Sequence, residues 1–515
     1  MGYGKLSVLE TTFRDGLQSE TIDSVGLKDS LEAIKLLDSL GFEYLELGFA
    51  VSNKGDRERL QEALKLGLRS KVAAFGRTAR SDAEAILALG VGVGVLVGKS
   101  RLSDVRNALG KTADGYLREV EESVRLLVEA GREVIFDAEH FFQALAEDDD
   151  GFAIHLLQAV FDSGASWLVF CDTNGKLATG NVKKFIHWAG RYVPLERIGV
   201  HFHNDRGRAL ANAEAAWAVG IRHFQGVFGG FGERAGNLDL STLLPNLVLD
   251  SGCADVAPEV LRRFTPTYHS LCATLGLSPD NHRPYVGRSV FYTEAGMHGS
   301  GELKDAGSYS HVDPKVVGNE VRFGVTELSG RANLVIKARE LGVELPADRL
   351  PRLAKEYKKL SDRGVSFGRA EASFHLWLLK ELGLFESPFE FLDWRIIDER
   401  LPGHKAKSEA SLRLKIGQEE TLFSARGDGP VNALEMALRR SLVKNFPVLE
   451  SVRLADFSLK TVDMQKGSAA VVRIRCDFSD GDRSWTTIGV REDFIDAAWE
   501  ALLDGYLYKI FLNRA

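Results

Sequence analysis

The sequence has no uninterrupted apolar run that approaches the roughly 20 residues needed to cross a lipid bilayer. It also has no excess of positive charge, because 65 lysines and arginines stand against 72 aspartates and glutamates and give a formal net charge of −7 at pH 7. We therefore expect neither a membrane span nor nucleic acid or an anionic membrane surface as a partner. The segment from Met1 to Ser7 has no signal-peptide pattern, which predicts a cytoplasmic protein.

Cysteine is scarce, with four residues in a chain of 515. The four are scattered without the CxxC spacing of a zinc ribbon and without the density of a disulfide framework: Cys171, Cys253, Cys272 and Cys476. This usage predicts reduced thiols. The rest of the composition is that of a globular protein, and the length exceeds what one hydrophobic core usually supports, so we expect at least two domains.

The first half of the chain alternates short apolar runs with amphipathic helical stretches. The predicted strands are 5–13, 44–49, 70–76, 93–98, 133–141, 167–173, 198–204 and 223–229. Helix-period segments such as 27–40, 117–129 and 209–219 lie between them. Eight strand–helix pairs in about 250 residues have the size and rhythm of a (β/α)8 TIM barrel. A doubly wound sheet is the alternative, but it would normally carry a glycine-rich phosphate turn where this chain has Arg14-Asp15-Gly16.

Beyond residue 250 the sequence pattern changes. Residues 266–400 are mostly helical, whereas residues 401–515 alternate strand-like runs with helices and show no internal repeat. The fold class is therefore α/β, with a TIM barrel over residues 1–265, a helical linker subdomain over 266–400 and an α+β domain over 401–515. The turn at 427–432 leads into a helix, and its backbone N–H groups either bind an anion or merely cap that helix.

Polar residues gather where the strands of the predicted barrel end. They follow or close five strands that are distant in sequence: Arg14 and Asp15, Glu46, Glu139 and His140, Asp172 and Thr173, His201 and His203. The C-terminal ends of all strands meet at one face of a barrel, where the active site forms. The sequence therefore predicts one polar pocket built from these stretches.

His201 and His203 lie two positions apart in the strand-like segment Ile198-Gly-Val-His-Phe-His-Asn-Asp205. Side chains at i and i+2 of a strand point to the same face, so the two imidazoles make half of a metal site. Such a pair is often only structural, and the nearby carboxylate of Asp15 favours the metal. Arg14 and Glu46 either act on a ligand or form an ion pair with each other.

Glu139 and His140 are neighbours in the predicted fifth strand, so their side chains point to opposite faces. Phe136, Ala138 and His140 share one face by alternation, and we therefore place Glu139 in the pocket.

Three segments together resemble a known family: Arg14-Asp15-Gly16, His201-Phe-His203 and Gly229-Gly-Phe-Gly-Glu-Arg-Ala-Gly-Asn237. They are similar to the signatures of the DRE-TIM metallolyases, a group that includes isopropylmalate, homocitrate and citramalate synthases and hydroxymethylglutaryl-CoA lyase. The resemblance covers nearly the whole chain and is greatest to the long-form citramalate synthases.

The resemblance implies a divalent metal (Mn²⁺, Mg²⁺ or Zn²⁺) with four ligands: Asp15, His201, His203 and Asn237. It also implies that Arg14 stabilises the developing alkoxide and that Thr173 binds the substrate carboxylate. Glu139 is then the carboxylate near the acetyl methyl group, and His298 a proton carrier.

The activity that the resemblance implies is the condensation of acetyl-CoA with a 2-oxo acid. The first expectation is pyruvate as acceptor and (R)-citramalate as product, in isoleucine biosynthesis. An isopropylmalate- or homocitrate-type synthase and a non-catalytic metal-binding sensor remain alternatives. The C-terminal domain is implied to serve homodimerisation and feedback regulation by an amino acid such as isoleucine.

Several loops depart from the family pattern, at 49–53, 99–105 and 206–208. Two added arginines, Arg206 and Arg208, and Arg101 after the fourth strand would suit a more anionic acceptor, or else form surface ion pairs. A small acceptor instead requires bulky walls, which we expect around Phe75, Leu96 and Phe136.

Overall fold

The computed structural model describes residues 5–513 with the exception of 23, 148–149, 294–309, 324–330, 369, 400–401, 403–406, 463–469 and 481–482. The chain divides into two compact units, one of residues 1–291 and 312–320 and the other of residues 292–311 and 321–515. Each unit has a hydrophobic core of its own.

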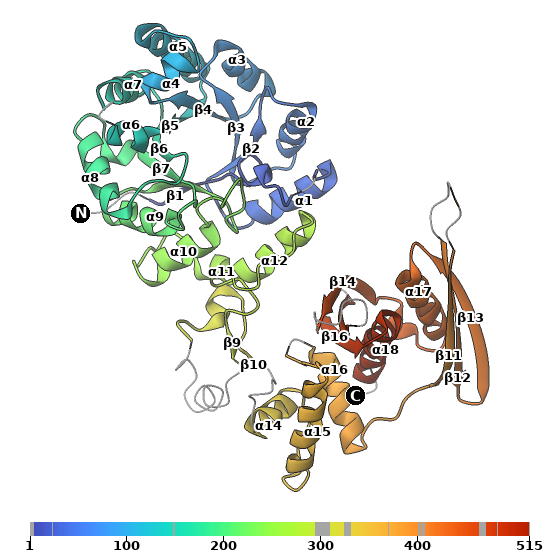
Figure 1. The fold of residues 1–515 in the computed structure, drawn as a ribbon. Helices are drawn as coiled ribbons and strands as arrows, with labels where there is room; N and C mark the ends of the chain where they lie inside the picture. The colour runs from blue at the N-terminus through green and yellow to red at the C-terminus, as the bar shows by residue number, and fades with distance from the viewer. Residues whose placement is uncertain are drawn as a thin grey trace. The chain divides into compact units, whose positions relative to one another are not determined.

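The first unit is a closed barrel of eight parallel strands in sequential order, in which β8 pairs with β1 (Figure 1). The strands are β1 (Ser7–Glu10), β2 (Tyr44–Phe49), β3 (Lys71–Arg77), β4 (Val93–Lys99), β5 (Glu133–Glu139), β6 (Trp167–Asp172), β7 (Ile198–Phe202) and β8 (His223–Gly226). All eight predicted strands are present, so the TIM-barrel prediction is confirmed.

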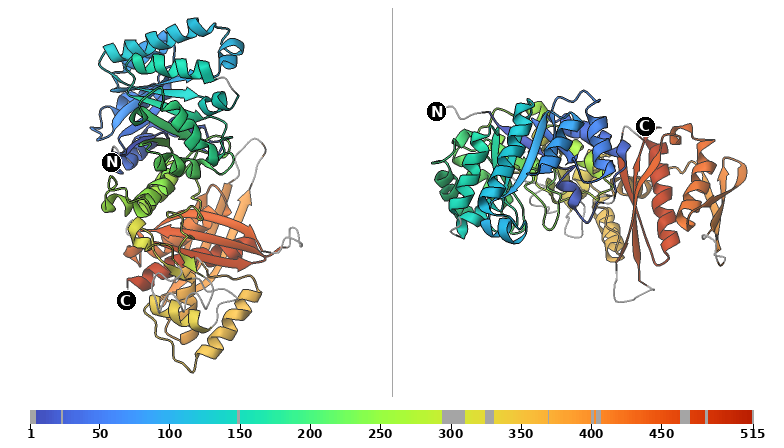
Figure 2. Two further views of the ribbon diagram at one scale, coloured as in Figure 1. Left: turned by 90° about the vertical axis from the view of Figure 1, so that its left-hand side faces the viewer. Right: turned by 90° about the horizontal axis from the view of Figure 1, so that it is seen from above.

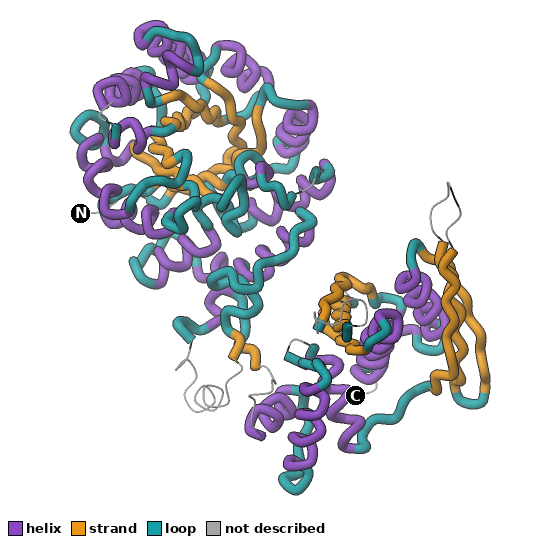
Figure 3. The backbone as a smooth tube through the Cα atoms, viewed as in Figure 1, coloured by secondary structure: helices purple, strands orange, loops and turns teal. Residues whose placement is uncertain are grey.

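Helices surround the barrel, and the strands form its inner layer (Figures 2 and 3). They are α1 (Leu27–Asp38), α2 (Lys54–Ala63), α3 (Arg80–Leu89), α4 (Leu102–Asn107), α5 (Ala113–Glu129), α6 (Phe141–Ala146), α7 (Asp150–Asp162), α8 (Thr179–Ala189), α9 (Ala209–Ala218), α10 (Leu240–Leu249), α11 (Pro258–Leu261) and α12 (Phe264–Thr274). Their apolar faces pack on the outward side chains of the strands in one continuous core.

Strand β1 ends earlier than the sequence predicts, at Glu10 rather than at residue 13. The buried carboxylate of Glu10 accepts a hydrogen bond from the backbone N–H of Thr12, at 3.1 Å. The N–H groups of Arg14 and Asp15 then donate to the carbonyl oxygen of Thr11, at 3.1 and 2.9 Å. These bonds turn the chain over the end of the barrel, so that Arg14 and Asp15 lie in a turn above β1.

The N-terminal end of the barrel is closed by side chains from β2, β6 and β8. The imidazole of His223 stacks on Trp167 with ring centroids 4.5 Å apart, and its Nδ1 lies 3.0 Å from the hydroxyl of Ser7. The Trp167 indole donates to the hydroxyl of Tyr44, at 3.3 Å. This layer is packed, so it closes the barrel at the end opposite the predicted pocket.

Complete burial lowers the pKa of His223 to about 3. The unfolded chain binds a proton below pH 6.5, but the folded barrel does not, so the free energy of unfolding should fall as the pH drops from about 6.5 towards 3. In His223→Phe this dependence should be shallower by about 1.4 kcal/mol per pH unit, measured by urea unfolding. The exposed histidine variant His155→Gln should retain the wild-type slope. Equal slopes for wild type and His223→Phe would contradict the prediction.

The second unit contains two consecutive βββα segments. In the first, β11 (Glu390–Glu399), β12 (Lys407–Ile416) and β13 (Glu419–Gly427) form an antiparallel sheet against which α17 (Pro430–Val443) packs. In the second, β14 (Arg453–Thr461), β15 (Val472–Ser479) and β16 (Ser484–Arg491) form a similar sheet covered by α18 (Phe494–Leu512). The sequence shows no repeat, yet the topology repeats. Strand β11 precedes residue 401, where we placed the start of this α+β domain.

The middle of the chain is helical, as predicted, with α14 (Arg331–Glu340), α15 (Leu350–Asp362) and α16 (Glu371–Leu382) packed in a small core. A short parallel pair joins β9 (Tyr292–Thr293) and β10 (Arg322–Phe323). None of the helices in the described ranges is long and apolar enough to span a membrane. All four cysteines are buried and unpaired, which agrees with the expectation of reduced thiols.

Candidate active site

A cavity of about 510 Å³ opens at the C-terminal ends of the barrel strands. Residues that follow or end β1, β3, β4, β5, β6 and β7 line it, and these include Arg14, Asp15, Phe75, Lys99, Asp137, Glu139, Thr173, His201 and His203. The predicted convergence is therefore observed for the ends of β1, β5, β6 and β7, whereas Glu46 of β2 and Asp172 of β6 do not line the cavity.

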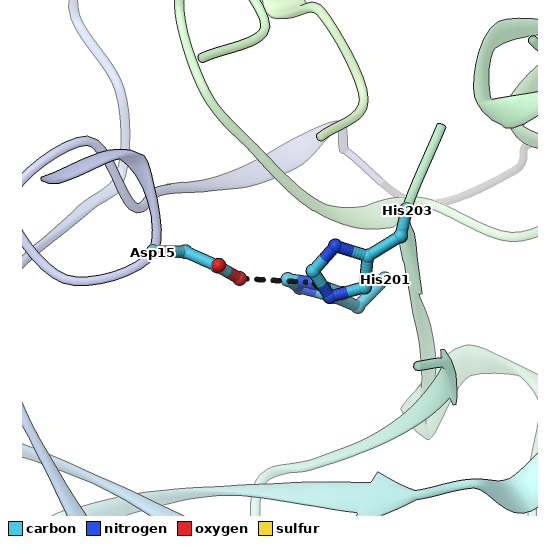
Figure 4. Close-up of side chains that lie close together, drawn as sticks. All are labelled: Asp15, His201 and His203. Carbon is cyan, nitrogen blue, oxygen red and sulfur yellow. Dashed lines mark hydrogen bonds and ion pairs between the residues drawn. The ribbon is translucent and has the colours of Figure 1, made fainter. Parts of the chain in front are cut away.

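Asp15, His201 and His203 form a buried cluster whose potential ligand atoms all lie within 4.8 Å of one another (Figure 4). The Nε2 atoms of the two imidazoles are 3.4 Å apart, and Nε2 of His201 is 3.2 Å from Oδ2 of Asp15. His201 in β7 and His203 directly after it stand two positions apart, and their imidazoles lie together, as predicted. A carboxylate and two imidazoles at these distances are a donor set that suits a divalent cation.

Asn237, the fourth predicted ligand, lies beside His203 because the two residues form an isolated antiparallel bridge. Its Nδ2 donates to the carbonyl oxygen of Phe231, at 3.0 Å, so the amide oxygen Oδ1 is directed away from Phe231. That buried Oδ1 has no hydrogen-bond partner among the described residues, as expected for an oxygen that binds a metal. Gly232 faces the amide so closely that a Cβ there would lie 2.3 Å from Nδ2 of Asn237.

The electrostatics of the cluster fit a cation. Burial by itself would raise the pKa of Asp15, but Arg14 and then His201 outweigh it and hold that pKa well below its usual range. Burial and the neighbouring His201 lower the pKa of His203 to about 3. The cluster therefore presents an ionised carboxylate and a neutral His203, which are the forms that bind metal.

Arg14 is fixed by two carboxylates and an aromatic ring. Its Nε donates to Oε2 of Glu46 at 2.8 Å, its Nη1 lies 3.0 Å from Oδ2 of Asp15, and its guanidinium carbon is 4.5 Å from the Phe75 ring centroid. Burial raises the pKa of the Glu46 carboxyl to about 7, against the opposing charge of Arg14. Glu46 thus positions Arg14, which is one of the two roles left open by the sequence.

Glu139 lies in the cavity, and its Oε2 is 2.6 Å from Nζ of Lys99 at the end of β4. His140 does not line the cavity. Its backbone is left-handed (φ 59°), and its N–H donates to the hydroxyl oxygen of Thr173 at 2.8 Å. The choice of Glu139 over His140 as the pocket residue agrees with this geometry. His298, the predicted proton carrier, lies outside the described residues.

The expectation about the pocket walls is wrong, and for the loop arginines the structure favours the alternative of surface contacts. Leu96 and Phe136 are fully buried and do not line the cavity, because they point outwards from the barrel into the helical layer; of the predicted walls only Phe75 lines it. The arginines of the altered loops do not line it either. Arg101 pairs with Glu147 at 2.7 Å, and Arg206 donates to the carbonyl oxygen of Lys176 at 3.1 Å.

The sequence analysis overlooked several residues of the site. Lys99, Asp137, Val97 and Tyr116 line the cavity, and Gln225 lies directly behind His201. The same alternation that selected Glu139 would have selected Asp137 and, in the neighbouring strand, Val97 and Lys99. Tyr116 comes from a helix, and no sequence pattern connects it to the pocket.

Comparisons with known proteins agree with this geometry. The HMGL-like family matches residues 5–260, the homocitrate synthase post-HMGL domain-like family matches 285–365, and the LeuA allosteric (dimerisation) domain matches 370–510. The chain is 34% identical to the (R)-citramalate synthase of Aquifex aeolicus, over 99% of this chain and 98% of that protein. It is 35% identical to the (R)-citramalate synthase of Streptomyces coelicolor, over 98% and 96% of the two chains. The chain therefore belongs to the HMGL-like acyltransferase family with a LeuA-type C-terminal domain, and Asp15, His201 and His203 are its metal-binding group.

Proposed function

We propose that this protein is an (R)-citramalate synthase, which converts acetyl-CoA, pyruvate and water to citramalate and CoA. The observation that carries the proposal is the similarity over the whole chain to several proteins of that activity, with the metal-binding group and Arg14 in place at the barrel mouth. Phe75 lines the cavity beside the Arg14 guanidinium. A bulky ring at this place limits the room next to Arg14, and this favours an acceptor with a substituent as small as methyl.

The residues of the cavity suit the bond changes of this reaction. A divalent cation at Asp15, His201, His203 and Asn237 would supply Lewis acidity towards the 2-oxo acid. Arg14 would stabilise the oxygen that becomes negative as the carbon–carbon bond forms, and Glu139 would remove the methyl proton of the acetyl group. Thr173 would donate its hydroxyl hydrogen to the acceptor carboxylate, since its oxygen already accepts from His140. Hydrolysis of the thioester then releases CoA, and His298 remains the predicted proton carrier.

The direct test is CoA release from acetyl-CoA by purified protein with Mn²⁺ or Mg²⁺. Pyruvate, 2-oxoisovalerate, 2-oxoglutarate and oxaloacetate are compared as acceptors, and EDTA serves as the control. We expect EDTA-sensitive release with the highest kcat/KM for pyruvate. Absence of release with every acceptor, by protein that contains metal, would contradict the proposal and favour a metal-binding sensor.

A second candidate is condensation with a dicarboxylic 2-oxo acid, as in homocitrate synthases. The observation that favours it is a set of cations on the cavity wall, formed by Arg77, Lys99 and Lys111. Each of these cations already pairs with a carboxylate, from Asp82, Glu139 and Glu119 respectively, so we rank this acceptor second. Preference for 2-oxoglutarate or oxaloacetate in the same assay would reverse the ranking.

Phe75 should set the size of the acceptor. In Phe75→Ala we expect kcat/KM for 2-oxoisovalerate to rise relative to that for pyruvate by about 10-fold or more, since each extra methylene that fits a pocket is worth roughly 10- to 200-fold. The matched control is Phe136→Leu, a neighbouring aromatic that points into the helical layer and should leave the ratio unchanged. An unchanged ratio in Phe75→Ala would show that this ring does not contact the acceptor.

We also infer that the protein is a homodimer regulated by an amino acid, because its C-terminal region matches an allosteric dimerisation domain. The segment 427–432 leads into α17, which begins at Pro430 with Gly429 as its N-cap, and the Asn432 side chain accepts from the N–H of Asp428 at 3.2 Å. Light scattering should give the mass of two chains, and isoleucine should inhibit CoA release. A monomer, or activity insensitive to branched-chain amino acids, would contradict these two inferences.

A further inference from the structure

A buried glutamine connects the metal-binding group to a carboxylate in the barrel interior. Gln225 lies on β8 in register with His201 on β7, and both side chains point into the barrel. Its Oε1 is 2.9 Å from Nδ1 of His201, and its Nε2 donates to Oδ1 of Asp137 at 2.7 Å. All three residues are almost entirely buried, with exposed fractions of 0% for Gln225, 3% for Asp137 and 4% for His201.

This chain of bonds has a direction. The NH₂ end of the Gln225 amide faces Asp137, because its Nε2 donates to that carboxyl group. The oxygen end then faces His201, and because an amide oxygen only accepts, Nδ1 of His201 must carry a hydrogen. Nε2 of the same ring is the atom that faces the metal position. That atom faces Oδ2 of Asp15 at 3.2 Å and Nε2 of His203 at 3.4 Å.

We propose that Gln225, oriented by Asp137, is a positioning residue that holds Nδ1 of His201 as a hydrogen-bond donor and so keeps Nε2 directed at the metal position. The His201 ring then needs no reorientation when the metal binds. Partners that orient a metal-ligating histidine commonly contribute about 10- to 100-fold to metal affinity. The inference concerns the metal-binding group alone, so it stands apart from the proposed choice of acceptor.

The first test uses the metal-free protein. In ¹⁵N-histidine-labelled apoprotein, long-range ¹H–¹⁵N correlations distinguish the two imidazole tautomers, and the His201 signals are identified by their loss in His201→Gln. We expect Nδ1 of His201 to carry a hydrogen in the wild type and to lack it in part of the molecules in Gln225→Leu. A wild-type apoprotein in which Nδ1 carries no hydrogen would overturn the proposal.

The second test measures Mn²⁺ affinity from the free-ion electron paramagnetic resonance signal. Gln225→Leu should weaken the Kd about 10- to 100-fold. The matched control is Gln143→Leu, because Gln143 is also a buried glutamine, bonded to Asp172 and Asn174 at 2.8 Å, but it does not contact the histidines. Wild-type affinity in a folded Gln225→Leu protein would contradict the proposal.

A paired exchange separates orientation from packing. In Gln225→Glu alone, two carboxylates face each other, and Mn²⁺ affinity should fall. Adding Asp137→Asn supplies an NH₂ donor to the new carboxylate, which still accepts from Nδ1 of His201, so the double variant should recover the hydrogen on Nδ1 and affinity within a few-fold of wild type. A folded double variant that stays as weak as the single variant would show that the role of Gln225 is only structural. This variant also decides the question if Gln225→Leu does not fold.

Discussion

Asp15→Asn is expected to lose the bound metal and to reduce kcat for CoA release by about 1,000-fold or more. The carboxylate is the one anionic member of the metal-binding group, and asparagine retains its shape without its charge. Lewis-acid stabilisation by a metal is worth several kcal/mol, and each 1.4 kcal/mol corresponds to a factor of ten in rate. Metal content by elemental analysis and CoA release by a thiol assay measure the two losses.

The control for Asp15→Asn is Asp82→Asn. Asp82 is also a buried aspartate that accepts from an arginine, Arg77, at 2.9 Å, but it lies outside the metal-binding group. The Asp82→Asn variant should have a lower free energy of unfolding than the wild type and should retain its metal. If the Asp15→Asn variant bound as much metal as the wild type and its kcat for CoA release stayed within 10-fold of wild type, the cluster would not be the metal site.

Arg14→Lys is the second substitution with a large expected effect, a fall in kcat of about 100- to 1,000-fold with a much smaller change in KM for the 2-oxo acid. The guanidinium bonds Glu46 through Nε and Asp15 through Nη1, and its central carbon lies over the Phe75 ring. A lysine ammonium is a point charge on a flexible stem and cannot reproduce this arrangement. Because the negative charge on the substrate oxygen develops in the transition state, the loss should appear in kcat.

Arg77→Lys is the matched control for Arg14→Lys. Arg77 also lines the cavity, but its side chain is 63% exposed and its ion pair with Asp82 lies on the rim. We expect less than about a 3-fold change with pyruvate, since lysine retains the positive charge beside Asp82 and Arg77 is not part of the metal-binding group. Equal losses in the two variants would indicate a general electrostatic effect of the rim instead of a specific role for Arg14.

Periodicity located all eight barrel strands, because strands buried on both faces are short apolar runs separated by amphipathic helices. For the C-terminal domain the sequence predicted alternating strands and helices, but not two consecutive βββα segments. Some of these strands are largely exposed, and their apolar residues are diluted by charged ones, as in β14 (RLADFSLKT). The repeated βββα topology was therefore visible only in the structure.

The alternation of side chains along a strand correctly predicted which residues share a face when it was followed through the whole strand. It gave a wrong prediction where residues of opposite faces were assigned to the same cavity. His201 and His203 share a face, and Glu139 was correctly separated from His140. The same alternation turns Phe136 away from the cavity, since it is three positions from Glu139, and yet we expected it in the wall. Leu96 points outwards from β4 in the same way.

The sequence by itself determined the barrel, the end of it that carries the site, and the pair of imidazoles, because each depends on spacing within a single element or on the common direction of parallel strands. The tertiary structure decided which residues from distant segments contact one another. Asn237 lies beside His203 through a bridge between distant segments. Lys99 at the end of β4 contacts Glu139 at the end of the adjacent strand β5. Gln225 connects His201 to Asp137 across the barrel. These contacts follow from strand register and loop closure, which depend on the packing of the whole barrel and leave no periodic trace in the sequence.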